Sequence, residues 1–213
     1  MNIWNQLIPD CPEAIVRAAD AALERVRPVW AQVDELVLRN QARVLAAFQE
    51  AGVSEVHFTE STGYGYNDIG REKLDEVFAR AFGAEAGLVR IQFASGTHAI
   101  ATGLFAALRP GDRLIAAAGA PYDTLQQVIQ GTVGSLAEWG IAYEEVPLRP
   151  DRTVDVEAVA AAVRKPDARC LFIQRSRGYS LRAPLTVAEI STVIRAAREA
   201  NPGITVLVDN CYG

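Results

Sequence analysis

The sequence has little cysteine or histidine. Its 213 residues include three cysteines, Cys11, Cys170 and Cys211, and two histidines, His57 and His98. Three scattered cysteines are too few for a disulfide framework or a zinc site, and two histidines offer a metal few nitrogen ligands. We therefore expect no metal site and a reducing, cytoplasmic environment.

Lysine is also scarce, and no part of the chain is strongly basic. Lys73 and Lys165 are the only lysines among 21 basic residues, so chemistry that needs a lysine amine has two candidates here. The 26 acidic residues bring the net charge to −5. Because a phosphate-binding surface for nucleic acid needs a basic stripe, we expect no nucleic-acid partner.

Long hydrophobic runs are missing. A membrane-spanning helix needs about 20 apolar residues in succession, and no stretch approaches that length. The N-terminus lacks the charged and apolar blocks of a signal peptide. With 50% hydrophobic and 22% charged residues, the composition is typical of a soluble globular protein that does not enter a membrane.

Apolar residues recur at helical spacing over residues 10–50, which predicts a helical N-terminal segment within residues 1–57. Proline is tolerated only in the first turn of a helix, so Pro28 should divide this segment into two helices or begin the second. The glycine-rich residues 58–70 predict an irregular loop, and residues 71–82 a further helix.

Apolar strands then alternate with helices. The predicted strands cover residues 88–93, 113–118, 143–146, 170–176 and 204–210, and the predicted helices cover 94–108, 122–140, 156–164 and 186–200. This alternation is typical of βαβ units, in which a mostly parallel sheet is flanked by helices on both faces. We therefore predict an α/β domain over residues 58–213.

The segment after the first predicted strand begins a helix with Ser95, Gly96 and Thr97. The amides and the dipole at a helix N-terminus can hold a phosphate, and the two hydroxyls add donors. The alternative is that Ser95 or Thr97 simply caps the helix.

Other polar residues follow later strands, where ligands bind in open α/β sheets. Tyr122 can face a planar ligand or cover the core. The segment with Arg175, Ser176 and Arg177 is either a place where the two arginines converge on a small anion or a solvated turn. Asp209 can bind a metal, pair with a cationic nitrogen or cap the next element.

Five segments together resemble pyridoxal-phosphate (PLP) enzymes of fold type I, the aspartate-aminotransferase fold. They are STGYGYNDIGREKLDE, FASGTHAIATGLFAALRPGD, GAPYDTL, IQRSRGYS and VLVDNCYG, in the family's order. They are most similar to the methionine gamma-lyase-like or aluminium-resistance proteins, which are related to the cystathionine lyases. The resemblance implies a PLP-dependent carbon–sulfur lyase with an amino-acid substrate, assembled as a homodimer or homotetramer.

The resemblance also implies roles for particular residues. Ser95, Gly96 and Thr97 would hold the cofactor phosphate, and Tyr122 would stack on the pyridine ring. Asp209 would pair with the ring nitrogen and keep it protonated, so that the ring can accept electrons from the substrate α-carbon. In this family, residues 58–213 would form the PLP-binding large domain.

Two further parts of the family pattern differ in this chain. Tyr64 matches a tyrosine that contacts the phosphate of the partner subunit, and Tyr66 stands where the cystathionine lyases have an arginine. The QRSRGY segment stands where those enzymes have an asparagine. Arg175, Ser176 or Arg177 would replace its contact or bind the substrate carboxylate.

The family's Schiff-base lysine lies about two dozen residues past the aspartate, beyond Gly213. We therefore expect the N-terminal part of a longer enzyme, inactive by itself. Two alternatives stay open. The chain can be a complete non-catalytic α/β protein that binds a phosphorylated ligand or a partner, or it can serve another PLP chemistry such as transamination or decarboxylation.

Overall fold

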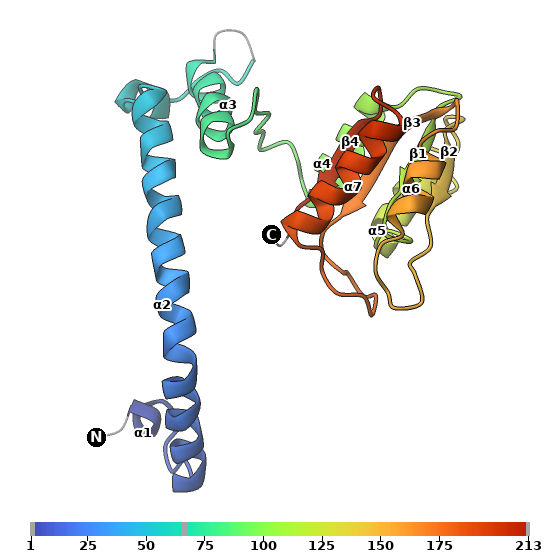
Figure 1. Ribbon diagram of the computed structural model, residues 1–213. Coiled ribbons are helices and arrows are strands. Elements are labelled where there is room, and N and C mark those ends of the chain that lie inside the picture. The colour runs from blue at the N-terminus through green and yellow to red at the C-terminus, as the bar shows by residue number, and fades with distance from the viewer. Residues whose placement is uncertain (1–2, 65–67, 212–213) are drawn as a thin grey trace. The chain divides into compact units, whose positions relative to one another are not determined.

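A computed structural model describes residues 3–64 and 68–211 (Figure 1). The chain forms two compact units, Met1–Arg90 and Ile91–Gly213. The domain boundary expected after residue 57 stays a prediction. No helix in the described ranges is long and apolar enough to cross a membrane.

The first unit is built around one long helix. Its elements are α1 (Ile3–Leu7), α2 (Glu13–Glu50), the 3-10 helix η1 (Glu55–Phe58) and α3 (Ile69–Phe82). Ala47 and Ala51 at the end of α2 pack against Val77 of α3 and form a small buried cluster.

The helix α2 runs without interruption through Pro28, so the predicted division into two helices is wrong. An interior proline removes one helical hydrogen bond and costs about 3 kcal/mol. Ending the helix there would instead leave two new ends with unpaired amides and carbonyls, and would require a second nucleation. Continuity across Pro28 is therefore the less costly arrangement.

The predicted strand over residues 88–93 is also wrong: the structure has no strand in this described segment. The amide of Val89 donates to Asp75 Oδ1 at 2.7 Å, and Arg90 Nη1 donates to the same oxygen at 2.6 Å. Because a side chain of α3 takes the amide that a sheet ladder would use, the segment is tied to α3.

The second unit is an α/β fold with a four-stranded parallel sheet, as the sequence predicted. Its elements are α4 (Gly96–Ala107), β1 (Arg113–Ala116), α5 (Asp123–Gln130), β2 (Ala142–Glu145), α6 (Val156–Ala162), β3 (Ala168–Gln174), α7 (Val187–Ala200) and β4 (Thr205–Asp209). The strand order is β2-β1-β3-β4, and every neighbouring pair is parallel.

Helices cover both faces of the sheet, with α6 and α7 in front of it and α4 and α5 behind it in Figure 1. Successive side chains of a strand point to opposite faces. Leu171 and Ile173 accordingly pack with the α6 and α7 cluster, whereas Cys170 and Phe172 pack with the α4 and α5 cluster. All four are buried, which explains the continuous apolar run of this strand.

The helix predicted over residues 122–140 is shorter than expected, since α5 ends at Gln130. A Cβ at Gly131 would lie 2.2 Å from the carbonyl oxygen of Gln127, and Gly134 has a positive φ of 71°. Residues 131–140 form turns instead, although Leu136 still packs in the core.

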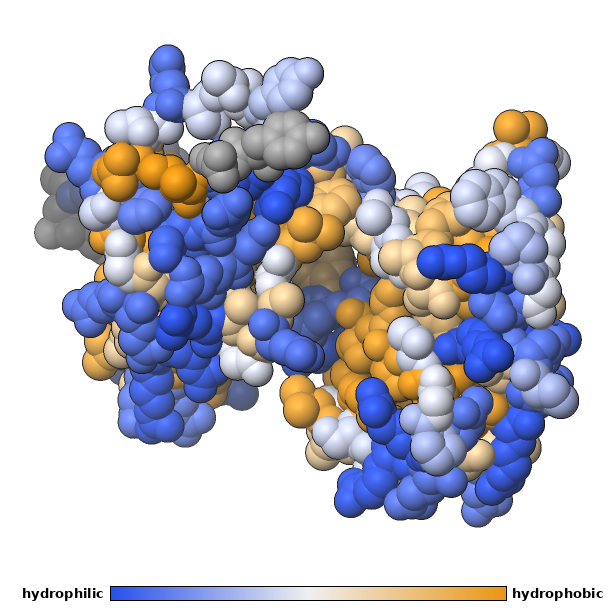
Figure 2. Space-filling model, turned by 90° about the horizontal axis from the view of Figure 1, so that it is seen from above, coloured by the Kyte–Doolittle hydropathy of each residue, from blue (hydrophilic) through white to orange (hydrophobic). Residues whose placement is uncertain are grey.

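Apolar side chains remain at the surface of both units, as the orange areas of Figure 2 show. In the second unit the most exposed large ones include Ile91, Val133 and Leu181, whereas the first unit has an exposed Phe58 and Phe82. Apolar atoms contribute a large share of any protein surface, so single exposed side chains need no special explanation.

Candidate functional site

The strand order places a ligand-binding position at one end of the sheet. The chain leaves β1 for β2 on one side, and then crosses to β3 and β4 on the other side. In open α/β sheets, ligands bind at the carboxyl ends of the strands where this reversal occurs. Tyr122 follows β1, Ser176 follows β3, and Asp209 ends β4, so these residues come to the same end.

A cavity of about 680 Å³ lies at this position. Five of the predicted site residues line it together: Gly96, Thr97, Tyr122, Ser176 and Asp209. Ser95 does not line the cavity but precedes Gly96 at the start of α4. The structure therefore brings together residues more than a hundred positions apart, while their functional roles stay predictions.

The N-terminus of α4 is capped and still open to the cavity. The Ser95 hydroxyl accepts a hydrogen bond from the His98 amide at 3.1 Å, and the Ala94 amide donates to His98 Nδ1 at 3.2 Å. A Cβ at Gly96 would meet nothing within 4 Å, so open space lies over the first turn. The first amides of a helix lack helical partners, and this end of α4 is therefore suited to an anion.

Tyr122 is held at both its backbone and its hydroxyl. Its amide donates to Gln174 Oε1 at 3.0 Å, and its hydroxyl shares a 3.0 Å hydrogen bond with Thr97 Oγ1. Burial raises the pKa of Tyr122, and the nearby Asp209 charge acts in the same direction, while the Thr97 hydrogen bond opposes them. The phenol therefore stays protonated at neutral pH.

Asp209 is a buried acid without a counter-charge. It is 6% exposed, and its Oδ1 accepts a hydrogen bond from the Cys211 amide at 3.0 Å. No lysine or arginine of the described chain forms an ion pair with it. Burial raises the pKa of this carboxyl. A cationic group in the cavity would stabilise its ionised form.

One role considered for Asp209 was metal binding, which needs further ligand side chains close by. Over residues 3–64 and 68–211, no three His, Cys, Asp or Glu side chains are grouped so as to hold a metal ion.

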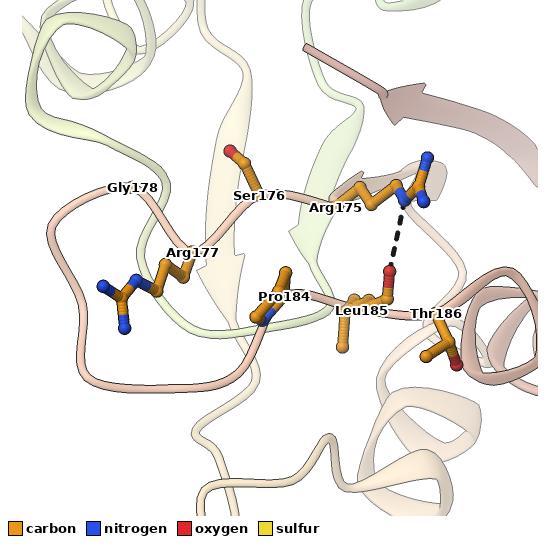
Figure 3. A pocket seen from close by; sticks show the side chains of 7 residues that line it. All are labelled: Arg175, Ser176, Arg177, Gly178, Pro184, Leu185 and Thr186. Atoms are coloured by element: carbon orange, nitrogen blue, oxygen red, sulfur yellow. Dashed lines mark hydrogen bonds between the residues drawn. The ribbon is translucent and has the colours of Figure 1, made fainter. Parts of the chain in front are cut away.

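The loop after β3 carries the two arginines of the predicted anion site. Figure 3 shows Arg175 and Arg177 extending in opposite directions beside a second cavity of about 520 Å³. Arg175 Nε donates to the Leu185 carbonyl at 3.2 Å, and its Nη1 donates to Asn210 Oδ1 at 2.7 Å. These contacts hold Arg175 at the Leu185 carbonyl and at Asn210, while both arginines line this cavity, so the predicted anion site stays a prediction.

Two tyrosines of the predicted site belong to the first unit. Tyr64 is 81% exposed, and its amide donates to Thr62 Oγ1 at 3.4 Å. Tyr66 lies outside the described residues. Their contribution to a neighbouring subunit stays a prediction.

Each lysine of the chain forms an ion pair, and Lys165 lies away from the cavity of the second unit. Lys73 belongs to the first unit, on α3, and its Nζ is 2.7 Å from Glu76. Lys165 forms an ion pair with Glu144 and precedes β3, at the amino end of the strands. The cavity lies at their carboxyl end, about 20 Å away along a seven-residue strand.

Sequence reasoning gave no role to two buried polar residues of this region: Gln174, the first residue of the QRSRGY segment, and Arg182. They are 6% and 4% exposed. Gln174 is the polar last residue of an apolar strand and pairs in register with Asp209, which is a signal that the sequence contains. Arg182 lies in an irregular loop and has no comparable local signal.

The sheet, with helices on both faces, and this cavity define a class of protein: an α/β protein with a cavity at the carboxyl ends of its parallel strands. The profile of the methionine gamma-lyase family matches residues 15–213. The chain belongs to this family, which confirms the resemblance found from the sequence motifs.

Two relatives illustrate how far the similarity extends. The uncharacterized protein YnbB of Bacillus subtilis (strain 168) is 48% identical over 186 residues, which cover 85% of this chain and 44% of that protein. The L-methionine gamma-lyase of Pseudomonas putida is 29% identical over 153 residues, covering 72% of this chain and 34% of the enzyme.

Solved structures agree with the fold. A Clostridium acetobutylicum protein, named as a candidate cystathionine beta-lyase involved in aluminium resistance, is 44% identical with a TM-score of 0.91, covering 95% of this chain and 49% of that one. A carbon–sulfur lyase involved in aluminium resistance from Clostridium novyi NT is 38% identical with a TM-score of 0.89, at 95% and 49% coverage. The chain thus spans about half the length of these relatives.

Proposed function

We propose that the full-length protein is a PLP-dependent carbon–sulfur lyase that acts on a sulfur-containing amino acid. The observation that carries this proposal is the buried Asp209, which has no counter-charge and shares one cavity with Tyr122 and the N-terminus of α4. A cofactor with a phosphate and a protonated ring nitrogen fits both ends of this cavity. Its phosphate is the anion that suits the N-terminus of α4, and its ring nitrogen is the cation that suits Asp209.

The residues around the cavity fit this cofactor. The first-turn amides of α4 at Gly96 and Thr97 bind the phosphate, while Ser95 keeps the turn in place through its bond to the His98 amide. Tyr122 presents its ring to the pyridine, with its hydroxyl oriented by Thr97.

Asp209 holds a proton at the ring nitrogen. Its charge acts strongly because burial removes the water that would screen it. When bound, PLP supplies an electron sink for the carbanion at the substrate α-carbon.

The proposal extends to the substrate and the assembly. Arg175, Ser176 or Arg177 contacts the substrate carboxylate or the cofactor, and the exposed Arg177 is the freer of the two arginines. The protein works in the cytoplasm as a homodimer or homotetramer. In this assembly Tyr64 and Tyr66 reach the cofactor phosphate of the neighbouring subunit.

The test uses the purified full-length protein. PLP is titrated by absorbance, and the loaded protein is then given methionine or cystathionine while thiol and 2-oxo acid are measured. A lyase releases thiol, 2-oxo acid and ammonia in equal amounts from the amino acid and water. A protein that does not bind PLP would contradict the proposal. Release of 2-oxo acid without thiol, and only with an amino-group acceptor, would show transamination instead.

A further inference from the structure

Gln174 joins the two loops that line the cavity. Its Oε1 accepts the hydrogen bond of the Tyr122 amide at 3.0 Å, and its Nε2 donates to the Ser176 carbonyl at 3.0 Å. Tyr122 follows β1 and Ser176 follows β3, so one buried amide connects the two sides of the position where the strand order reverses.

Arg182 holds the loop that follows β3. Its Nη2 donates to the carbonyl oxygens of Gln174, at 2.7 Å, and of Ser176, and its Nη1 donates to the Ala183 carbonyl at 3.0 Å. The side chain is 4% exposed and has no carboxylate partner in the described chain. A buried guanidinium is costly to desolvate, so it is retained where its planar set of donors satisfies several carbonyls together.

Gly178 shows that the loop is packed closely against this pair. Its φ is +54°, and a Cβ there would lie 3.2 Å from Gln174 Nε2 and 3.6 Å from Tyr122 Cβ. The loop therefore returns over Gln174 and Tyr122 before it presents Tyr179 at the cavity, where that side chain is 92% exposed.

We infer that Gln174 and Arg182 are positioning residues of the cofactor cavity, which hold Tyr122 and the wall formed by residues 176–179 in place for the ring. The inference rests on the proposed function. Neither side chain is assigned to touch the cofactor or the substrate. Their effect is transmitted through the Tyr122 amide and the Ser176 carbonyl.

The experiment compares variants of the full-length protein. Gln174→Met keeps the length of the side chain but removes its hydrogen bonds to the Tyr122 amide and to Ser176. Arg182→Met removes the guanidinium, and Arg182→Lys keeps the charge without the planar donors. Gln127→Met and Arg195→Met, at exposed positions of α5 and α7, are the matched controls.

Two measurements are made on each variant. Hydrogen–deuterium exchange of the cofactor-free protein reports on the segments 119–123 and 175–185, and a PLP titration with circular dichroism reports on affinity and on the surroundings of the bound ring. Loss of buried hydrogen bonds should weaken PLP binding about tenfold in Gln174→Met and Arg182→Met. Both segments should exchange faster, and the dichroism per bound cofactor should change.

Arg182→Lys should recover only part of the affinity, because one ammonium cannot reach three carbonyls at once. Wild-type affinity and dichroism in Gln174→Met would overturn the inference, and this variant decides the question if the Arg182 variants do not fold. Failure of the wild-type protein to bind PLP would instead contradict the proposed function.

Discussion

At the scale of single residues, the most informative group is the Asp209 carboxyl. Burial raises its pKa above the value of about 3.9 that an unfolded aspartate has. A raised pKa means that the folded state binds the proton more tightly than the unfolded state. The contribution of Asp209 to stability is therefore fully present below the unfolded pKa and is lost as the pH rises through the folded pKa.

We predict that Asp209→Asn in the cofactor-free, full-length protein is as stable as the wild type at pH 7, or more stable. The asparagine oxygen can still accept the hydrogen bond of the Cys211 amide, and the cost of a buried charge is gone. This advantage should disappear below about pH 4, where the wild-type acid is protonated. Denaturant unfolding at the two pH values measures the difference.

The same variant should bind PLP about a hundredfold more weakly, because the ring nitrogen loses its buried partner. Asp34→Asn, at an exposed position of α2, serves as the control for removing one carboxylate. An Asp209→Asn protein that is less stable at pH 7 and binds PLP normally would show that the carboxylate has only a structural role.

At the scale of secondary-structure elements, the N-terminus of α4 combines a cap with an available positive end. Ser95 caps the helix, and the first turn contains no acidic residue. An acidic side chain there would neutralise the helix dipole, so its absence leaves the dipole and the amides for an anionic ligand. The capping and phosphate-binding interpretations of Ser95 are therefore compatible.

We predict that Ser95→Asp keeps the capping of α4 but weakens phosphate binding. Aspartate is as good an N-cap as serine and interacts favourably with the dipole, so the cofactor-free protein should keep its stability. A fixed negative charge beside the bound phosphate should weaken PLP binding about tenfold. Thermal unfolding and a PLP titration measure the two effects.

Ser95→Asn is the matched control, since asparagine caps equally well without a charge and should bind PLP almost as the wild type does. Ser95→Ala should lose about 1 kcal/mol of stability with the cap. Equal PLP affinity of the Asp and Asn variants would place the phosphate elsewhere.

At the scale of the whole second unit, the two ends of the sheet differ in how their charges are paired. At the amino end, Arg113 donates to both carboxylate oxygens of Asp167, and Glu144 pairs with Lys165. At the carboxyl end, Asp209 is buried and forms no ion pair with a residue of the described chain. Paired charges stabilise the fold, whereas an unpaired buried charge is a feature of functional sites.

Both lysines of the chain are engaged in ion pairs, and we predict that neither attaches the cofactor. A full-length protein with Lys73→Arg and Lys165→Arg keeps both ion pairs and should bind PLP with unchanged affinity. After borohydride reduction, peptide mapping of the wild type should find the adduct on another lysine. An adduct on Lys73 or Lys165 would contradict the assignment.

Much of the fold follows from the sequence, because its signals are local. The apolar runs identify β3 and β4 to within two residues, and Thr186 and Ser95 mark the starts of α7 and α4 through their caps. The predicted strand at residues 88–93 fails for the opposite reason. Its apolar pattern is typical of a strand, but the distant Asp75 takes its amide.

The sequence by itself determined the parallel α/β class, the family motifs and the residue types at the strand ends, since periodicity and capping depend on near neighbours. Only the tertiary structure decided that Thr97, Tyr122 and Asp209 line one cavity, that Arg175 and Arg177 diverge, and that Gln174 joins two loops. These depend on strand order and on contacts between residues far apart in the chain, which a local pattern does not encode.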